Sequence, residues 1–312
     1  MRRKGENRLI KDEIAECAKF IDEVIDGYLP KEEGPASTVI SAMNYSIHVG
    51  GKRLRPMMML LSYRMFGGDA EKEVLYPFMA AIEMIHTYSL CHDDLPAMDN
   101  DEYRRGKKST HAQYGEAMGI LAGDGLLNYA FETALRAFDA NDVPASAVSS
   151  ALKILAKKAG IYGMIGGQVV DIESEEKSQG KILMDTIKYI HENKTAAMIE
   201  SSLMIGATLA GASHDEVDAM ERIGSDVGLA FQIQDDILDV TGCEEALGKP
   251  VGSDERNGKT TYVTLVGLDK AKEDVAAISE RAIGELLHLR KRDSESGEFL
   301  SELIRSLIDR DR

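Results

Sequence analysis

Residues 231–240 read FQIQDDILDV, and the spacing of their polar and apolar residues is that of an α-helix. The polar side chains share one stripe, at offsets 0, 3, 4 and 7: Gln232, Asp235, Asp236 and Asp239. Ile233, Ile237 and Val240 form the opposite, apolar stripe. The segment therefore predicts an amphipathic helix that carries a row of carboxylates along one side.

Helical spacing continues on both sides of this segment. Apolar residues between 10 and 28 recur at intervals of 4, 3, 4, 3 and 4. Ser37 or Thr38 is the expected N-cap of the next helix, and Pro56 suits the first turn of the one after it. Further helical runs are predicted at about 72–95, 114–138, 147–172, 182–210, 215–241, 261–288 and 295–308. No strand pattern, repeat or linker interrupts them, so we expect one all-α domain of roughly ten helices over residues 1–312.

The composition limits the classes of partner. With 53 acidic and 37 basic residues, the net charge of −16 makes nucleic acid an unfavourable ligand. The same charge would repel a free diphosphate, so a site for an anionic substrate must supply its own cations. Hydrophobic residues make up 44% of the 312 positions, which is enough for a sizeable core.

The three cysteines are far apart and show no CxxC spacing, which is consistent with a reducing compartment. The N-terminal MRRKGENRLIKDE is basic, but no apolar run follows it, so no signal peptide is expected. The apolar stretch PFMAAIEMIHTYSL carries Glu83 and His86 and is too polar for a membrane span. We therefore expect a cytoplasmic protein without stable membrane association.

The first acidic cluster in chain order, CHDDLPAMDNDEYRRG, occupies residues 91–106, and FQIQDDILDV is the second. Asp93 and Asp94 are expected to end a helix, and Asp99 lies beyond the helix-breaking Pro96. A loop could then return the Asp99 carboxylate towards a metal ion at Asp93. Arg104 follows, in a pair of arginines that can bind phosphate bidentately. The alternative interpretation of this cluster is a solvated surface loop.

Carboxylates one helical turn apart repel each other unless a cation lies between them. Asp235 and Asp239 are separated by roughly 6 Å along the helix axis, and such like-charge pairs cost about 0.2–0.5 kcal/mol when exposed. Mg²⁺ takes oxygen ligands, keeps several waters and bridges carboxylates to substrate phosphates. The two acidic clusters together therefore predict a magnesium-dependent diphosphate site, whereas either one alone could be a solvated face.

Basic residues gather in three further places. The segment GGKRLRP, residues 50–56, holds Lys52 and Arg55 between glycines and a proline, where backbone can approach an anion. Lys194 opens an apolar helical run, where an unpaired lysine is costly. Lys249 and Lys259 lie on a glycine-rich loop after the second acidic cluster. That loop has one residue too many between its glycines for a P-loop, and no strand precedes it.

In combination these motifs resemble the trans-prenyl diphosphate synthases, which condense isopentenyl diphosphate with an allylic diphosphate. The resemblance runs from about residue 44 to 265 and rests on GGKRLRP, HTYSLCHDDLPAMDNDEYRRG, GGQVVD, NKTAAM, FQIQDDILD and GKPVGSDERNGKTTY. It implies the isoprenoid synthase fold around a central cavity and a homodimer whose interface includes residues 114–138. It also implies Mg²⁺ as cofactor, with Mn²⁺ as a substitute and about three ions in the closed complex.

The resemblance also assigns roles. Six aspartates are implied as metal ligands: Asp93, Asp99 and Asp235, supported by Asp94, Asp236 and Asp239. Cationic side chains are implied to hold the allylic diphosphate: Arg104, Lys194 and Lys259, with Lys249 also binding substrate. The metal-free isopentenyl diphosphate pocket would comprise Lys52, Arg55, His86 and Arg105. Polar groups would line the reaction centre: Gln168, Asp171, Thr195 and Gln232.

The length of the product is expected to depend on an aromatic residue before the first acidic cluster. Tyr88, with Ser89 beside it, resembles the bulky floor of the chain pocket in short-chain members and favours the C15 product, farnesyl diphosphate, over C10 or C20. The alternative is an ordinary core tyrosine.

A class I terpene cyclase would need an Asn/Asp-Ser/Thr-Glu second metal motif. A His-Asp phosphohydrolase would not need the basic cluster, and a non-catalytic subunit would have lost aspartates. Asp124, in an apolar helix, is expected to be buried.

Overall fold

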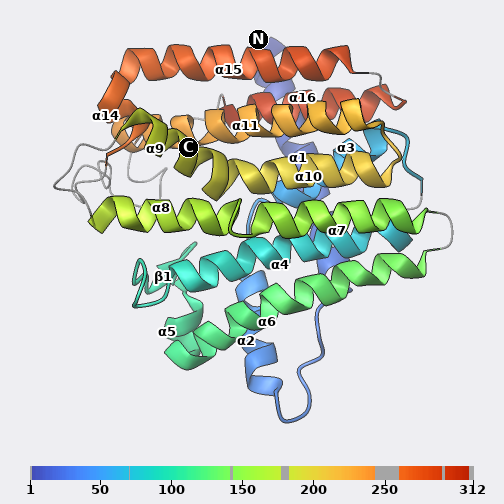
Figure 1. Ribbon diagram of the computed structural model, residues 1–312, viewed down its shortest axis with the longest axis vertical. Helices are drawn as coiled ribbons and strands as arrows, with labels where there is room; N and C mark the ends of the chain where they lie inside the picture. Colours follow the sequence, from blue (N-terminus) through green and yellow to red (C-terminus); the bar gives the residue numbers. More distant parts are fainter. Residues whose placement is uncertain are drawn as a thin grey trace. The chain divides into compact units, whose positions relative to one another are not determined.

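The computed structural model describes residues 2–69, 71–140, 143–176, 183–242, 260–289 and 292–308, and these are almost entirely helical (Figure 1). The all-α prediction is confirmed. The chain forms two compact units, which we describe separately: unit 1 comprises Met1–Leu60 and Asp69–Leu152, and unit 2 comprises Leu61–Gly68 and Lys153–Arg312. The expectation of a single domain over the whole chain stays a prediction. In the part of the chain that is described, no helix has the length and apolarity to cross a membrane.

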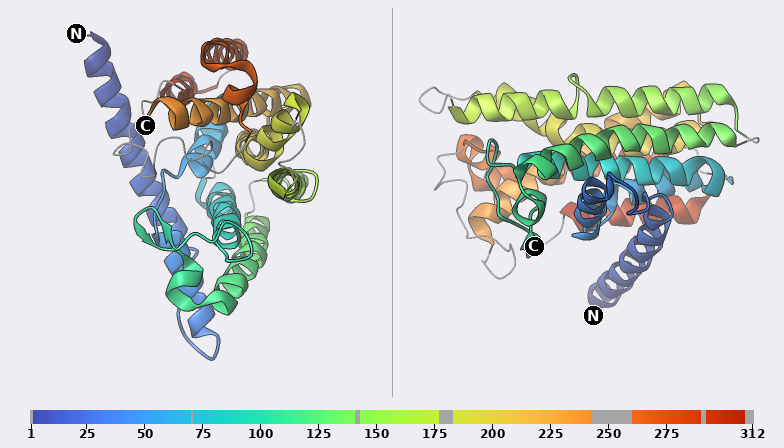
Figure 2. Two further views of the ribbon diagram at one scale, coloured as in Figure 1. Left: turned by 90° about the vertical axis from the view of Figure 1, so that its left-hand side faces the viewer. Right: turned by 90° about the horizontal axis from the view of Figure 1, so that it is seen from below.

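Unit 1 is built around a pair of neighbouring helices, α4 and α6 (Figures 1 and 2). Its elements in chain order are α1 (Arg2–Asp26), α2 (Ser37–His48), the start of α3 (Leu54–Met65), the π-helical η1 (Glu71–Leu75), α4 (Tyr76–Asp93), β1 (Tyr103–Arg104), β2 (Lys107–Lys108), α5 (Thr110–Tyr114), α6 (Glu116–Leu135), the 3₁₀ turn η2 (Arg136–Asp139) and the start of α7 (Ala145–Ala159). Helix α4 is apolar on nearly every side, as a central helix must be, and Phe78 and Ile82 on it are fully buried.

Unit 2 is organised around α11, which lies between α10 and α15 (Figure 1). Besides the ends of α3 and α7, its elements are α8 (Met164–Glu176), α9 (Met184–Ile190), the π-helical η3 (His191–Ala196), α10 (Ala197–Leu209), α11 (His214–Thr241), α14 (Tyr262–Val266), α15 (Leu268–His288) and α16 (Ser294–Ile308). A capping box between Ser213 and Glu216 fixes the start of α11, because each residue satisfies a backbone N–H of the other.

The helix predicted from FQIQDDILDV is the C-terminal end of α11. Ile233 and Ile237 are buried, at 0% and 3% exposure, so the apolar stripe packs into unit 2 as expected. Val240 is the exception, because it lies in the last turn of α11 and is half exposed. This end of α11 therefore presents the predicted carboxylate row from a helix whose other side is anchored in the core.

Three predicted helical runs are interrupted in the structure. The run 147–172 ends at Ala159 and restarts at Met164, because Gly163 packs so tightly that a Cβ there would lie 2.1 Å from the carbonyl oxygen of Lys158. The run 261–288 breaks at Gly267, whose φ of 85° lies outside the helical region. The run 182–210 contains the π turn η3, which inserts a wider turn between α9 and α10.

Smaller expectations also need correction. The N-cap of α2 is Ala36, which makes no side-chain cap bond, rather than Ser37 or Thr38. Asp124 is exposed, with 62% of its side chain accessible, because it lies on the outer side of α6. A short antiparallel hairpin pairs β1 with β2, although the sequence showed no strand pattern. Its two-residue turn needs positive φ at both positions, and Arg105 and Gly106 adopt 53° and 77°.

Candidate active site

The first acidic cluster forms a closed turn at the end of α4. The helix ends at Asp93, and the backbone N–H of Asp99 donates to the carbonyl oxygen of Asp93 at 2.9 Å. Asn100 allows the reversal by adopting a φ of 55°, a conformation that asparagine tolerates well. The predicted return of the loop is therefore confirmed at the level of the backbone. Asp99 is exposed and Asp93 is partly so, which leaves both carboxylates accessible to a cation.

Asp94 occupies a different environment from its neighbours. It is only 2% exposed, and the Nε of Arg104 donates to its two oxygens at 2.8 and 2.9 Å, with Nη2 also bonded to Oδ1. Burial alone would lower the pKa of Arg104, but these bonds and the nearby Asp101 and Asp93 raise it. Asp94 thus fixes the arginine of strand β1 beside the aspartate turn.

Three of the four residues predicted to bind isopentenyl diphosphate lie close together in unit 1 and form a basic group: Arg55, His86 and Arg105. The fourth, Lys52, is exposed. The guanidinium of Arg105 lies against Gly51, where a Cβ would come within 2.7 Å of Nη1, so a side chain there would displace the end of Arg105. Arg55 is half buried, and its Nε has no hydrogen-bond partner in the described part of the chain. Burial lowers the pKa of Arg55, which the nearby Arg105 lowers further and Glu83 counteracts. A concentrated positive charge with unused donors is suited to an anion.

His86 faces this basic group from α4. Burial, followed by the charges of Arg55 and Arg105, holds the pKa of His86 well below its ordinary value of 6.5. The imidazole is therefore neutral at physiological pH. In that state it can donate one hydrogen bond to a phosphate oxygen without adding a further positive charge to the cluster.

This pKa shift predicts an acid sensitivity of the fold. Between the folded pKa of His86 and 6.5 the unfolded chain binds more protons than the folded one, so the free energy of unfolding falls as the pH drops below about 6.5. One such group contributes a slope of up to about 1.4 kcal/mol per pH unit. In thermal melts from pH 7.5 to 5, we expect His86→Gln to lose less stability than the unsubstituted protein. The exposed His214 supplies the control: His214→Gln should follow the unsubstituted protein, and parallel curves for His86→Gln would contradict the prediction.

In unit 2, Lys194 and Asp171 form an ion pair. The Nζ of Lys194, in the π turn η3, donates to Oδ2 of Asp171 on α8 at 2.6 Å, and Asp171 is only 5% exposed. A Cβ on Gly167 would lie 2.2 Å from the backbone nitrogen of Lys194, so α8 and η3 touch through their backbones. The expectation that this lysine needs a partner is confirmed. Gln168 and Thr195, beside these residues in sequence, are half buried.

The aspartates of α11 differ in their surroundings although they share a stripe. Asp236 accepts a hydrogen bond from the backbone N–H of Tyr262 at 2.8 Å, and the Nε2 of His191 lies 3.9 Å from the same oxygen. Asp239 is buried at 3% exposure. Asp235 is partly exposed and accepts a hydrogen bond from the Nε2 of Gln232 at 3.2 Å. Asp235 and Asp236 are therefore both partly exposed, whereas Asp239 is not.

The carboxylates of the two aspartate motifs are suited to Mg²⁺. Among the described residues, no three His, Cys, Asp or Glu side chains gather into a ready-made metal cage. Mg²⁺ does not require one, because it is usually bound by one or two carboxylates, water and substrate phosphate oxygens. Asp93 and Asp99 in unit 1 and Asp235 in unit 2 each supply a carboxylate of this kind, so the residues of each unit fit a metal that binds together with a diphosphate. Lys249 and Lys259 lie outside the described residues.

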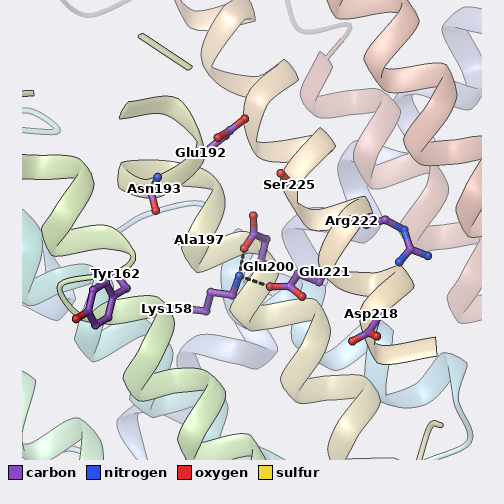
Figure 3. Close-up of a pocket in the computed structure, with 10 residues that line it drawn as sticks. All are labelled: Lys158, Tyr162, Glu192, Asn193, Ala197, Glu200, Asp218, Glu221, Arg222 and Ser225. Carbon is purple, nitrogen blue, oxygen red and sulfur yellow. Dashed lines mark hydrogen bonds and ion pairs between the residues drawn. The ribbon is translucent and has the colours of Figure 1, made fainter. Parts of the chain in front are cut away.

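A separate pocket of about 550 Å³ lies in unit 2 and contains none of the predicted site residues (Figure 3). Lys158 points between two carboxylates, donating to Glu221 at 2.5 Å and also to Glu200. Burial raises the pKa of Glu200, and Lys158 opposes the shift. Lys158 therefore offsets part of the negative charge of the two glutamates and ties α7, α10 and α11 together.

Sequence reasoning missed two partners of the site. Arg53 was noted only as part of a basic segment, and Glu83 only as a polar residue in an apolar stretch, yet the two form a buried ion pair beside Arg55. One signal was available: Glu83 precedes His86 by three residues and so lies on the same face of α4.

An all-α fold with two aspartate motifs and a basic anion pocket defines a class of enzyme that acts on diphosphates with divalent metal ions. The polyprenyl synthetase family profile matches residues 37–296. Farnesyl diphosphate synthase of Geobacillus stearothermophilus is 43% identical over 293 residues, which cover 93% of this chain and 95% of that protein. Geranylgeranyl diphosphate synthase of Cyanophora paradoxa is 40% identical, over 88% and 89% of the two chains. The chain belongs to the polyprenyl synthetase family and is a prenyltransferase.

Solved structures agree with this assignment. Geranylgeranyl pyrophosphate synthetase of Pyrococcus horikoshii matches with a TM-score of 0.85 and 31% identity over 98% of this chain and 99% of that one. Geranyltransferase of Helicobacter pylori, crystallised with magnesium and isoprenyl diphosphate, matches with a TM-score of 0.83 and 30% identity over 96% and 97%. The helical architecture is therefore that of the isoprenyl synthases.

Proposed function

We propose that the chain condenses isopentenyl diphosphate with dimethylallyl or geranyl diphosphate and releases farnesyl diphosphate. The observation that carries the proposal is the arrangement in unit 1, where accessible aspartates at the end of α4 adjoin a basic group. Arg55 in this group has an unused donor, and the guanidinium of Arg105 lies against Gly51. The acidic turn suits a metal-bridged diphosphate, and the basic group suits a second, metal-free one.

Each set of residues has its part in the reaction. Arg55, Arg105 and the neutral His86 hold the diphosphate of isopentenyl diphosphate, together with Lys52. Asp93, Asp99 and Asp235 would hold Mg²⁺, which when bound stabilises charge on the leaving diphosphate. Three further aspartates support them, two by fixing neighbouring backbone and side chains: Asp94, Asp236 and Asp239. Arg104, Lys194 and Lys259 neutralise the same diphosphate from other sides, and Lys249 assists.

Bond making and breaking follow from this placement. The C–O bond of the allylic diphosphate breaks, leaving an allylic cation, and the double bond of isopentenyl diphosphate attacks that cation to form a C–C bond. A proton then leaves the new chain, with the released diphosphate as its acceptor. Oxygens of Thr195 and Gln232 stabilise the cation without bonding to it. No protein nucleophile takes part.

A C20 product is the second candidate, because a geranylgeranyl diphosphate synthase is 40% identical to this chain. The C15 assignment rests on Tyr88, which is 5% exposed and lies on α4 five residues before Asp93. Ser89, beside it, donates to the carbonyl oxygen of His86 at 2.8 Å. A bulky side chain at this place would stop chain growth early.

The remaining features are proposed on narrower grounds. A homodimer is supported by large apolar side chains exposed along α6 and η2: Ile120, Leu121, Leu135 and Phe138. We propose Mg²⁺ as the physiological metal, with Mn²⁺ as a substitute and about three ions in the closed complex. A cytoplasmic location rests on the cysteine usage of the sequence.

The proposal is tested by a product assay. The purified protein is incubated with isopentenyl diphosphate and, in turn, dimethylallyl, geranyl or farnesyl diphosphate, with Mg²⁺ or with EDTA. We expect C15 to accumulate from the first two starters with Mg²⁺ and no elongation with EDTA, because the leaving diphosphate then lacks its counter-charge. Accumulation of C20 would favour the second candidate, and elongation in EDTA would contradict the metal requirement.

A further inference from the structure

A buried carboxylate lies in the middle of the basic group. Glu83, on α4, is only 2% exposed and is one turn from His86. A negative charge at this place works against the binding of an anion, and its own burial is unfavourable. Such a residue in an anion pocket needs a different explanation from electrostatic attraction of the substrate.

The contacts of Glu83 supply that explanation. Its Oε1 accepts a hydrogen bond at 2.7 Å from Nη1 of Arg53, a residue that is 4% exposed. The same guanidinium donates from Nε to Oδ1 of Asp22 at 2.7 Å and from Nη2 to the carbonyl oxygen of Ile47 at 2.8 Å. Arg53 is thereby fixed from α4, α1 and α2 at once, with its planar group held in three directions.

The backbone at Arg53 is as constrained as its side chain. Its φ of 49° lies in the left-handed region, which non-glycine residues enter only when their surroundings hold them there. Gly50, at a φ of 102°, makes the other reversal of the same loop. Because Arg53 lies between Lys52 and Arg55, the conformation held at residue 53 sets the directions in which those two cationic side chains leave the loop.

Glu83 also acts on the arginines around it. Burial lowers the pKa of Arg55 and the pKa of Arg105, and the charge of Glu83 opposes both shifts. Its carboxylate is therefore a compensating charge for guanidinium groups that would otherwise repel one another. Without it, the same groups would be driven apart.

We propose that Glu83 and Arg53 are positioning residues for the isopentenyl diphosphate subsite. Their buried ion pair holds the loop 50–56 in the one shape that presents Lys52 and Arg55 to the diphosphate, and neither residue contacts the substrate itself. The inference rests on the proposed function and adds to it the two residues that hold the loop 50–56 in its substrate-binding shape.

The direction of the change in KM separates positioning from electrostatics. If Glu83 acted only through its charge, Glu83→Gln would bind the anion more tightly and lower the KM for isopentenyl diphosphate. If it positions the loop, the same variant should raise that KM by about tenfold. The KM for geranyl diphosphate should change by less than about twofold. Steady-state kinetics with each substrate varied in turn gives both values, with melting temperatures measured alongside.

Matched variants sharpen the comparison. Glu13→Gln removes an exposed charge from unit 1 and should leave both KM values unchanged. Asp22→Asn loosens Arg53 from its half-exposed partner and should raise the KM for isopentenyl diphosphate by about two- to threefold even if Glu83→Gln does not fold. Arg53→Met should raise it as much as Glu83→Gln, and the double variant no further, since both act through one ion pair.

A binding measurement distinguishes failure of this inference from failure of the proposed function. Calorimetric titration with isopentenyl diphosphate, without an allylic substrate, should detect binding to the unsubstituted protein and weaker binding to the Glu83→Gln variant. No binding to the unsubstituted protein would overturn the proposed function. Equal or tighter binding to Glu83→Gln and Asp22→Asn would overturn the positioning role alone.

Discussion

Replacing Asp235 by asparagine is expected to lower kcat/KM by about 10³-fold or more in saturating Mg²⁺. The substitution keeps the volume and one oxygen of the side chain but removes the charge that a divalent cation requires. Asp235 is partly exposed, while Asp236 is engaged by the backbone of Tyr262. Steady-state assays at increasing Mg²⁺ should show that more metal restores only part of the activity.

Asp218 provides the control, because it is an exposed aspartate on the same helix. Asp218→Asn should retain activity within about twofold, since surface charges contribute little. Melting temperatures of both variants should match that of the unsubstituted protein or exceed it, because removing one of several neighbouring carboxylates relieves repulsion. Near-normal turnover by Asp235→Asn would show that the second acidic motif does not bind the catalytic metal.

Truncating Tyr88 to alanine should shift the product from C15 to C20 and longer chains. The ring is 5% exposed, packs edge-on against His92 at a centroid distance of 5.8 Å, and has a hydroxyl with no hydrogen-bond partner in the described part of the chain. Burial, with the nearby Asp93, raises the pKa of Tyr88 to about 12, so the side chain is an uncharged, bulky group. Chain-length analysis of the products with excess isopentenyl diphosphate gives the answer.

Tyr88→Phe distinguishes bulk from polarity. Phenylalanine keeps the ring and removes only the unsatisfied hydroxyl, so the product should stay at C15 and stability should not fall. The alanine variant leaves a cavity and costs on the order of 3–5 kcal/mol, so its assays belong well below its melting temperature. A folded Tyr88→Ala protein that still releases only C15 would leave Tyr88 as an ordinary core residue.

Much of the fold was predictable because helix formation follows local spacing. The run 215–241 matches α11 almost to the residue, and the return of the loop after Pro96 followed from the helix-breaking property of proline. The interruptions at Gly163 and Gly267 were not predictable. Glycine is tolerated within helices, and the sequence does not show where one packs against a nearby carbonyl or adopts a positive φ.

For the site, the sequence identified the residue types but not their partners. Asp93 and Asp94 are adjacent and chemically identical, yet one ends α4 within reach of solvent and the other is enclosed by Arg104. The ion pair between Arg53 and Glu83 joins residues thirty positions apart, and no local sequence pattern predicts it. Such pairings depend on the angle at which helices meet, which is a property of the packed core.

The π turn η3 contains about one more residue per turn than an α-helix, and this changes the direction in which Lys194 points. Because an α-helix turns about 100° per residue, a one-residue insertion of this kind reorients everything before it relative to α10. An ideal α-helix over residues 191–196 would have better backbone hydrogen-bond geometry. It would also turn Lys194 away from Asp171. The irregular backbone of residues 191–196 therefore serves to point the Lys194 side chain towards Asp171.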